Sequence, residues 1–328
     1  MSRAVGRVRA VVGILVVLVV LIGGAVALGV VGAPSVAGVE NRFAGVDQET
    51  TTIETDVVVN NPNPIGIRLG DVTVNYTVDL NGVRLASGTK SGVNVTTGNS
   101  TLAFRTAMAN EQIPKWWVAH IRDGERSDLA VHADARSGTL GRTVSFDPVD
   151  RQIETDLLAS FNSSETRPVN ANQPVVSDPV LFVNETGASW GAVSEAETPM
   201  RMAFVVYNPK TTPYTVTGIG YEITMNDVAV GSGESDRAYT IPPKSTRTVR
   251  AVTAIDNSKL DEWWVSHVAR NQVTDLRIDF YARVELPVGE TIRVPLDALT
   301  YEKRIETDFF GTKPDTGTER DSSSSTPT

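Results

Sequence analysis

The chain has 328 residues, of which 41% are apolar, and it carries a formal net charge of −9 at pH 7. An acidic chain lacks the basic face that nucleic acid requires, so the charge argues against a nucleic-acid partner. The chain contains no cysteine, which excludes disulfide bonds, thiolate metal sites and cysteine nucleophiles. The length predicts about two domains.

The amino-terminal part of the chain is apolar. Residues 10–31 carry no charged side chain, and they are numerous enough to cross a bilayer as a helix. Because Arg3, Arg7 and Arg9 precede them, the positive-inside rule predicts a single-pass anchor at 10–31. Residues 1–9 are then cytoplasmic and the domains lie outside the cell. A cleaved signal peptide is the alternative, since the Ala-Val-Ala triplet at 25–27 fits a small-residue cleavage site.

The rest of the chain contains one unit twice. Residues 43–62 align with residues 190–209 without a gap, at an offset of 147 (190 minus 43). A repeat of this length is a duplicated domain rather than a short-period solenoid. We therefore predict two domains with independent cores. The expected divisions are domain 1 at 35–160, a polar linker at 161–177, domain 2 at 178–310 and a disordered tail at 311–328.

Each unit is predicted to consist mainly of strands. Apolar and polar side chains alternate in residues 72–80, which is the pattern of a strand with one buried face. Asn81-Gly82 follows, a dipeptide typical of two-residue hairpins, and Asn226-Asp227 takes its place in the second unit. Short alternating strands separated by turns favour two tandem antiparallel β-sandwich domains of the fibronectin-III or immunoglobulin type.

One segment of each unit has helical spacing instead. Its apolar residues recur at i, i+3, i+4 and i+8, which predicts one short amphipathic α-helix per unit. The residues are Ile113, Trp116, Trp117 and Ile121 in the first unit and Leu260, Trp263, Trp264 and Val268 in the second. We expect the tryptophans to pack in the core against the sheets, and the alternative is that they line a ligand groove.

A strand in each unit runs into an Asn-Pro motif. Three valines at 57–59 precede Asn61-Pro62-Asn63-Pro64, and the second unit retains only Asn208-Pro209. Pro cannot donate to a sheet ladder and fixes φ, while an Asn side chain replaces lost ladder bonds. The motif is therefore predicted to be architectural, forming a rigid crossing between two strands rather than a binding site.

Together these marks resemble the water-stress and hypersensitive-response (WHy) domain, which is shared with type-2 late-embryogenesis-abundant (LEA) proteins. The resemblance rests on residues 60–88 and 207–233, and it covers both units but not the anchor, the linker or the tail. Seven of the 30 basic residues are Lys and the others are Arg. This acidic, Val-rich composition resembles that of proteins from salt-adapted archaea.

No catalytic constellation is predicted. His120, His132 and His267 lack further ligands at helical or short-loop spacing, so we interpret them as structural. Ile-Glu-Thr-Asp strings at 53–56, 153–156 and 305–308 place carboxylates along strands, where they favour solvated edges. We predict no enzyme activity, no metal and no cofactor. Five glycosylation sequons fit an outward-facing protein, at Asn75, Asn94, Asn99, Asn162 and Asn184.

The resemblance implies a non-enzymatic role in tolerance of desiccation or osmotic stress, performed by two acidic domains outside the cell. Two alternatives stay open. The first is a lipid-binding module with an apolar groove, which has been proposed for relatives of the type-2 LEA fold. The second is an envelope scaffold that interacts with other envelope proteins, since many surface β domains serve that purpose. The expected partners are therefore the membrane, lipid or envelope proteins, and the sequence does not specify an oligomeric state.

Overall fold

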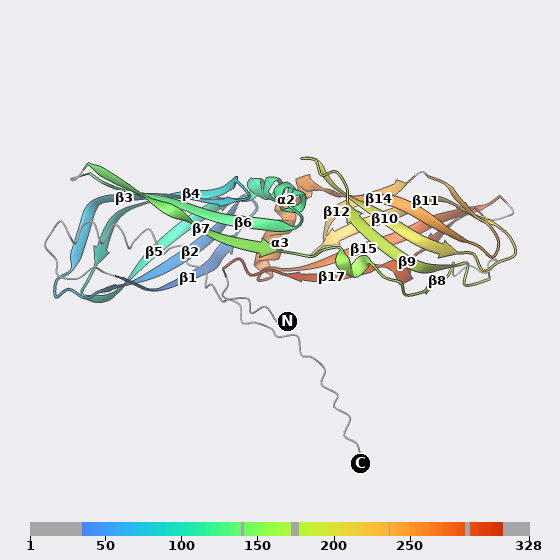
Figure 1. The fold of residues 1–328 in the computed structure, drawn as a ribbon, viewed down its shortest axis with the longest axis horizontal. Coiled ribbons are helices and arrows are strands. Elements are labelled where there is room, and N and C mark those ends of the chain that lie inside the picture. Colours follow the sequence, from blue (N-terminus) through green and yellow to red (C-terminus); the bar gives the residue numbers. More distant parts are fainter. Residues whose placement is uncertain (1–34, 139–140, 172–176, 236, 286–288, 311–328) are drawn as a thin grey trace, which may run out of the picture.

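The computed structural model describes residues 35–138, 141–171, 177–235, 237–285 and 289–310. The described protein is elongated, with two sets of strands placed end to end and two helices at the junction between them (Figure 1). We call the first set repeat 1 and the second set repeat 2. The predicted anchor and the predicted tail lie outside the described residues. Within the described ranges, no helix is long and apolar enough to cross a membrane.

Repeat 1 forms a sheet of seven antiparallel strands in the order β1-β2-β5-β4-β3-β6-β7. A single residue pair, Ala86 with Met108, joins β4 to β5, so the sheet divides there into two parts. The strands are β1 (Ser35–Val46), β2 (Thr50–Asn61), β3 (Ile67–Leu80), β4 (Val83–Val95), β5 (Gly98–Ala109), β6 (Arg126–Ser137) and β7 (Arg142–Glu154).

The strands of repeat 2 that correspond to those of repeat 1 have the same order, but they form two separate sheets. One sheet has the order β14-β10-β9-β8, and the other has β12-β11-β15-β16 with β13 and β17 attached to it. The strands are β8 (Arg167–Val169), β9 (Leu181–Trp190), β10 (Glu197–Tyr207), β11 (Tyr214–Met225), β12 (Val228–Ser235), β13 (Tyr239–Ile241), β14 (Thr246–Asp256), β15 (Val273–Glu285), β16 (Thr291–Pro295) and β17 (Tyr301–Glu306).

Local sequence explains these strands and their turns. In β2, Val57 and Val59 are fully buried, while Val58 between them is half-buried, as the period of a strand requires. Asn81 and Gly82 both have positive φ, at 48° and 75°. This is the backbone of a two-residue hairpin turn, which matches the right-handed twist of the flanking strands. The prediction of a mainly β, antiparallel protein is confirmed.

The two predicted helices are α2 (Ile113–Arg122) and α3 (Leu260–Ala269), and each follows a short 3₁₀ turn, η1 (Asn110–Gln112) or η3 (Asn257–Lys259). Both helices lie at the junction of the repeats (Figure 1). The large hydrophobic cluster of the described residues accordingly contains side chains of both repeats. This corrects the prediction of two independent cores, because the helices that close the two repeats pack on one another. The far end of repeat 1 has a separate, valine-rich cluster.

Part of the segment predicted as a linker belongs to repeat 2. Phe161, at the end of η2 (Ala159–Phe161), is buried with its ring centroid 6.0 Å from that of Phe204 on β10. Val169 on β8 is also buried, and β8 pairs with β9. The polar, proline-rich composition at 161–177 concealed these apolar anchors, so repeat 2 begins before residue 178. A further 3₁₀ turn, η4 (Asp297–Leu299), lies between β16 and β17.

Candidate functional site: the repeat junction and the cavity of repeat 1

The first Asn of the Asn-Pro motif is buried in both repeats. In repeat 1, Asn61 Nδ2 donates to the carbonyls of Ile65 and Thr96, at 3.0 and 3.1 Å. Asn61 Oδ1 accepts from the backbone N–H of Asn63 at 3.1 Å. These are backbone partners that hold the crossing between strands, as expected of an architectural motif. Pro62 and Pro64 are exposed. Asn208 makes the equivalent bonds in repeat 2, to Thr212, Ile241 and Lys210.

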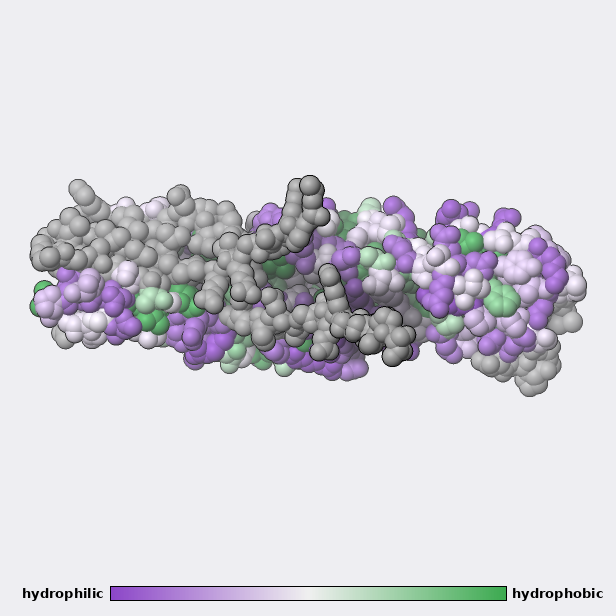
Figure 2. All heavy atoms as spheres, turned by 60° about the horizontal axis from the view of Figure 1, so that its bottom comes forward, coloured by the Kyte–Doolittle hydropathy of each residue, from purple (hydrophilic) through white to green (hydrophobic). Residues whose placement is uncertain are grey.

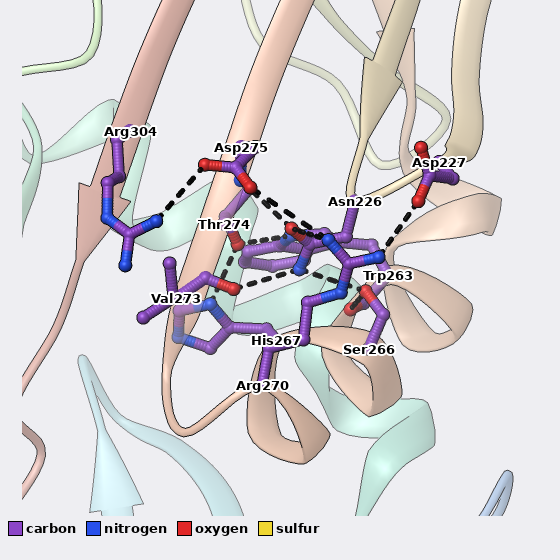
Figure 3. A network of polar contacts seen from close by, with 10 residues as sticks. All are labelled: Asn226, Asp227, Trp263, Ser266, His267, Arg270, Val273, Thr274, Asp275 and Arg304. Carbon is purple, nitrogen blue, oxygen red and sulfur yellow. Dashed lines mark hydrogen bonds and ion pairs between the residues drawn. The ribbon is translucent and has the colours of Figure 1, made fainter.

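The Asn of each hairpin turn clamps the turn to the strand that follows the helix. Asn226 Nδ2 donates to the carbonyl of Val273 at 2.9 Å, and its Oδ1 accepts from the N–H of Asp275 at 2.9 Å (Figure 3). Arg270, directly after α3, forms an ion pair with Asp227 of the same turn at 2.8 Å. The turn, the end of α3 and the start of β15 are thereby fixed together. Asn81 repeats the clamp in repeat 1, on Arg126 and Asp128.

One tryptophan of each helix anchors the helix to its own repeat. Trp116 Nε1 donates to the hydroxyl of Ser127 at 2.7 Å, and that hydroxyl lies 2.8 Å from His120 Nδ1. His120 Nε2 lies 2.9 Å from the hydroxyl of Thr155, which itself donates to Glu125. Because Thr155 uses its proton on Glu125, it accepts from Nε2–H, and Nδ1 accepts from Ser127. This arrangement of donors and acceptors is that of a neutral imidazole with its proton on Nε2.

The same chain of contacts occurs in repeat 2. Trp263 donates to Thr274 at 2.8 Å, and His267 Nδ1 lies 2.7 Å from the same hydroxyl (Figure 3). His267 Nε2 lies 2.9 Å from the hydroxyl of Thr307. Burial lowers the pKa of His120 to about 4, although a backbone bond to Arg126 and the charge of Asp123 act in the opposite direction. These buried, fully bonded histidines show no open coordination or acid-base position. Within the described residues, no group of three His, Asp or Glu side chains is placed to hold a metal ion.

The other tryptophan of each helix reaches into the opposite repeat. Trp117 Nε1 of α2 donates to the Thr198 hydroxyl of β10 at 3.1 Å. Trp264 Nε1 of α3 donates to the Thr51 hydroxyl of β2 at 3.0 Å. The two donors are repeat mates, and so are the two acceptors. The junction is thus a reciprocal contact of the kind that a two-fold axis generates between identical subunits.

Aromatic packing at the junction follows the same reciprocal rule. The ring centroids of Trp117 and Trp263 are 5.6 Å apart, and those of Trp116 and Trp264 are 6.0 Å apart, both in edge-to-face geometry. All four tryptophans are buried, with at most 6% of their surface exposed. They are therefore core residues, but the core that they build is shared between the repeats.

A buried carboxylate adds a further bond across the junction. Glu125 is 8% exposed, and it accepts from the indole N–H of Trp190 in repeat 2 at 2.9 Å. It also accepts from the N–H of Leu157 at 2.7 Å. Charge-assisted hydrogen bonds of this kind compensate for the desolvation of a carboxylate. The repeat mate of Glu125 is Gln272, which accepts from the N–H of Phe309 in the same way.

Repeat 1 encloses an apolar cavity of ≈ 80 Å³. Its polar side chains are bonded to one another: Thr55 donates to Asn41 at 2.7 Å, and the hydroxyls of Tyr76 and Thr106 are 2.7 Å apart. None of the described side chains that line it is charged. The lining comes from both parts of the repeat 1 sheet and from three aromatic residues of the repeat 2 side, namely Trp264, Phe309 and Phe310.

The remaining predicted residues lie on the surface. Of the predicted sequon residues, Asn75, Asn94, Asn99 and Asn162 are exposed and Asn184 is half-buried. His132 is exposed. The two carboxylates of the first Ile-Glu-Thr-Asp string lie on the outer face of β2, where Arg105 and Arg42 bind Glu54 and lower its pKa.

Sequence reasoning missed the reciprocal acceptors and the cavity. Thr51 and Thr198 align at the offset of 147 and are buried, but a threonine in a strand gives no signal of a partner on another domain. Phe309 and Phe310 follow the last predicted strand, and the sequence offered no reason to place them against repeat 1. The alignment of the repeats was the one signal in the sequence that bears on the junction, because it shows that Trp117 and Trp264 occupy equivalent positions.

The fold and the junction define the class: a tandem β-domain protein whose two units pack through their helices. Residues 56–152 and 203–298 each match the family of late embryogenesis abundant proteins, LEA_2. These stretches cover more than half of the chain and fall on the two repeats, so the chain belongs to this family.

Individual relatives each match about one repeat. An uncharacterized protein of Methanocaldococcus jannaschii is 26% identical over 143 residues, which is 43% of this chain and 80% of the relative. A crystal structure of a protein from Archaeoglobus fulgidus is 28% identical and covers 38% of this chain and 98% of its own, with a TM-score of 0.36. A solution structure from Arabidopsis thaliana is 15% identical, covers 42% of this chain and 93% of its own, and has a TM-score of 0.30. The family assignment rests on the two matched stretches alone.

Proposed function

We propose that this chain is a non-enzymatic protein of the response to water loss, held at the cell membrane by residues 10–31 with both repeats outside the cell. The observation that carries the proposal is the family match on both repeats, because the LEA_2 family is associated with desiccation and stress. The resemblance of the Asn61 motif to the WHy domain and the acidic, Arg-rich composition support the same setting. In this proposal each repeat is an antiparallel β-sandwich of the fibronectin-III or immunoglobulin type.

The described surface suits a protein that works hydrated. Figure 2 shows a mainly hydrophilic face over repeat 2, interrupted by small hydrophobic spots. Among the described residues, the large hydrophobic side chains that are strongly exposed are Ile65 and Val252. Charged side chains also pair across strands, as Arg42 of β1 does with Asp56 of β2 at 2.8 Å. A folded acidic surface of this kind stays hydrated and repels its own copies as water is withdrawn.

Survival after drying tests the stress function. Cells that lack this chain are dried and rewetted, and cells that carry it are treated in parallel. We expect lower survival without the chain and restored survival with the intact gene, but not with Trp264→Ala, which disrupts the junction. Equal survival of all strains after drying and after an osmotic upshift would remove the stress function.

Protease treatment of intact cells tests the location. If the repeats lie outside, added protease digests them without lysis, and residues 10–31 stay with the membrane fraction. Digestion only after lysis would reverse the proposed orientation. Recovery of a mature chain that starts after residue 27 would replace the anchor with a cleaved signal peptide.

A second candidate is a lipid-binding module, and the apolar cavity of repeat 1 is the observation that favours it. Native mass spectrometry of the purified chain, followed by extraction of bound molecules, tests it directly. Retained lipid at a fixed ratio to protein supports binding, and a chain free of lipid contradicts it. A third result would favour the envelope scaffold. In that case the chain retains no lipid, its loss does not change survival after drying, and envelope proteins copurify with it.

A further inference from the structure

The cavity lies at a gap in the core of repeat 1. Val57, Val59 and Val74 belong to a cluster at the far end of the repeat, and Leu80 and Met108 belong to the cluster at the junction. The cavity lies where the two clusters meet: Leu80 and Met108 of the junction cluster line it, and so do Tyr76 and Phe104, which pack against the far cluster. The described part of repeat 2 shows no such division, because its buried hydrophobic residues belong to one continuous cluster. Interiors are normally packed without voids larger than a water molecule, so the gap in repeat 1 calls for an explanation.

The pairing of strands shows which residues of repeat 2 take the corresponding places. Thr55 pairs with Asn41 in repeat 1, and their mates are Met202 and Ala188. At a second level of the core, Val78 pairs with Val131, and the corresponding pair in repeat 2 is Ile223 with Ile278. Met202, Ile223 and Ile278 are fully or almost fully buried. Repeat 2 is thus filled at the level where repeat 1 is hollow.

The chemistry of the lining limits what the cavity accepts. The Thr55–Asn41 and Tyr76–Thr106 hydrogen bonds satisfy its polar groups internally, so water gains few partners by entering. A charged group would be desolvated without a counter-ion, because none of the described lining residues is charged. An uncharged hydrocarbon is the chemistry that fits.

Size sets a further condition. At ≈ 80 Å³ the cavity is smaller than the engineered cavity of about 150 Å³ that binds benzene. A longer hydrocarbon therefore needs the wall to move. Part of this wall is aromatic and incompletely buried: Phe43 of β1 is half-buried and lies 4.8 Å from Phe310, ring centroid to ring centroid. Phe310 is also half-buried, and it belongs to the chain that leaves repeat 2.

We propose that repeat 1, and not repeat 2, binds one uncharged hydrocarbon chain between its sheet parts, and that the aromatic residues Trp264, Phe309 and Phe310 form the lid. This rests on the lipid-binding candidate above and specifies its site. Because the lid comes from repeat 2, entry of the chain requires a shift at the junction. The reciprocal tryptophan contact then serves to close the site as well as to join the repeats.

Photolabelling tests the site in the full chain held in a lipid nanodisc. The probe is dodecanol with a diazirine at its terminal carbon, and peptide mass spectrometry locates the adducts. We expect adducts on β2, β3 and β5 and none on β10, β11 and β14. Val78→Ile/Val131→Ile, which copies the repeat 2 residues, should lower repeat 1 labelling about tenfold, since one methylene in an apolar pocket has an effect of that order. Asn41→Ala/Thr55→Met provides a second, chemically independent filling variant.

Matched control variants distinguish the effect of filling the cavity from a general disturbance of the fold. Val58→Ile/Val252→Ile adds the same two methylene groups to side chains that are not in the lining, and it should leave labelling unchanged. Phe310→Ala should raise the initial labelling rate, while Phe310→Tyr keeps the ring and should not. Melting curves of the filled variants verify that they fold.

The outcomes are distinct. Equal labelling of both repeats, or undiminished labelling of a folded, filled variant, overturns the proposal. If native mass spectrometry finds bound lipid but repeat 1 is not labelled, the chain binds lipid and the site proposed here is wrong. If the chain neither retains lipid nor takes label in its repeats, both are wrong.

Discussion

Trp264 of repeat 2 donates its indole N–H to Thr51 of repeat 1 at 3.0 Å, across 213 residues of sequence. The mate of this bond, from Trp117 to Thr198, crosses the junction in the opposite direction at 3.1 Å. Each acceptor is held in turn by an Asn of the following 3₁₀ turn: Thr51 donates to Asn110 at 2.7 Å, and Thr198 donates to Asn257 at 2.9 Å. The stability of either repeat therefore depends on a side chain of the other.

Truncation of Trp264 tests this dependence. Trp264→Ala should lower the free energy of unfolding by about 3–5 kcal/mol, because it removes a fully buried indole and leaves a cavity. Chemical denaturation measures the change. Trp264→Phe keeps most of the packing and should cost less, and Val252→Ala at an exposed position should cost almost nothing. A near-normal denaturation curve for Trp264→Ala would show that the indole is not part of the core.

Separated repeats should be less stable than the joined pair. Residues 35–160 alone lack Trp264, Phe309 and Phe310, which close the end of repeat 1. Residues 155–310 alone lack Trp117, which occupies the corresponding end. We expect each piece to melt well below the full chain in calorimetry, with increased binding of a hydrophobic dye. If both pieces melt at the temperature of the full chain, the shared core contributes nothing.

Stability should fall in mild acid because of His120. Its pKa in the folded chain is lowered to about 4 from an ordinary value of 6.5. Between these values the unfolded state binds more protons, so the free energy of unfolding decreases as pH falls from 6.5 toward 4. The shift corresponds to about 3 kcal/mol, and this contribution is complete above pH 6.5.

Denaturation at a series of pH values measures this slope. His120→Gln should be less stable at neutral pH and should show a flatter dependence on acid. His132→Gln changes an exposed histidine and should keep the slope of the natural chain. An unchanged slope in His120→Gln would assign the acid sensitivity to other groups.

The side-chain hydrogen bonds of Asn226 should contribute more to the free energy of unfolding than the conformation of its turn does. Asn226→Ala removes the bonds to Val273 and Asp275 and places a residue with poor tolerance for positive φ at 53°. We expect a loss of about 2–3 kcal/mol from the unsatisfied backbone groups and the strain. Asn226→Gly relieves the strain without restoring the bonds, and should recover a minor part. Full recovery by Gly would mean that the clamp bonds contribute little.

Local features were predictable from the sequence, and relations between the repeats were not. Some patterns depend only on residues that are close in the sequence, and these predicted a strand, a hairpin and a helix. They are the alternation in 72–80, the turn at Asn81 and the spacing of Trp116 and Trp117. The direction of Trp117 could not be read in this way. A helical stripe specifies that an indole is buried, but not whether the surface that buries it belongs to its own domain.

The candidate site was even less accessible to sequence reasoning. A cavity remains where the backbone encloses more volume than the side chains fill. The sequence gives only the volume of the side chains. Alignment of the repeats would have placed Val78 opposite Ile223 and Thr55 opposite Met202, but smaller side chains in one copy are equally compatible with a collapsed core. Only the spacing of the backbone in the structure shows that the core of repeat 1 has not collapsed around its smaller side chains.

The reciprocal junction has a consequence for a cell that loses and regains water. Two separate subunits meeting through this surface would associate and dissociate as their concentration changed with the amount of water around them. In the single chain the partner is covalently attached, and a short connection gives it an effective concentration on the order of millimolar regardless of dilution. The assembled form of the pair is therefore set by the gene and not by mass action, and it is the same in dilute surroundings as in dry ones.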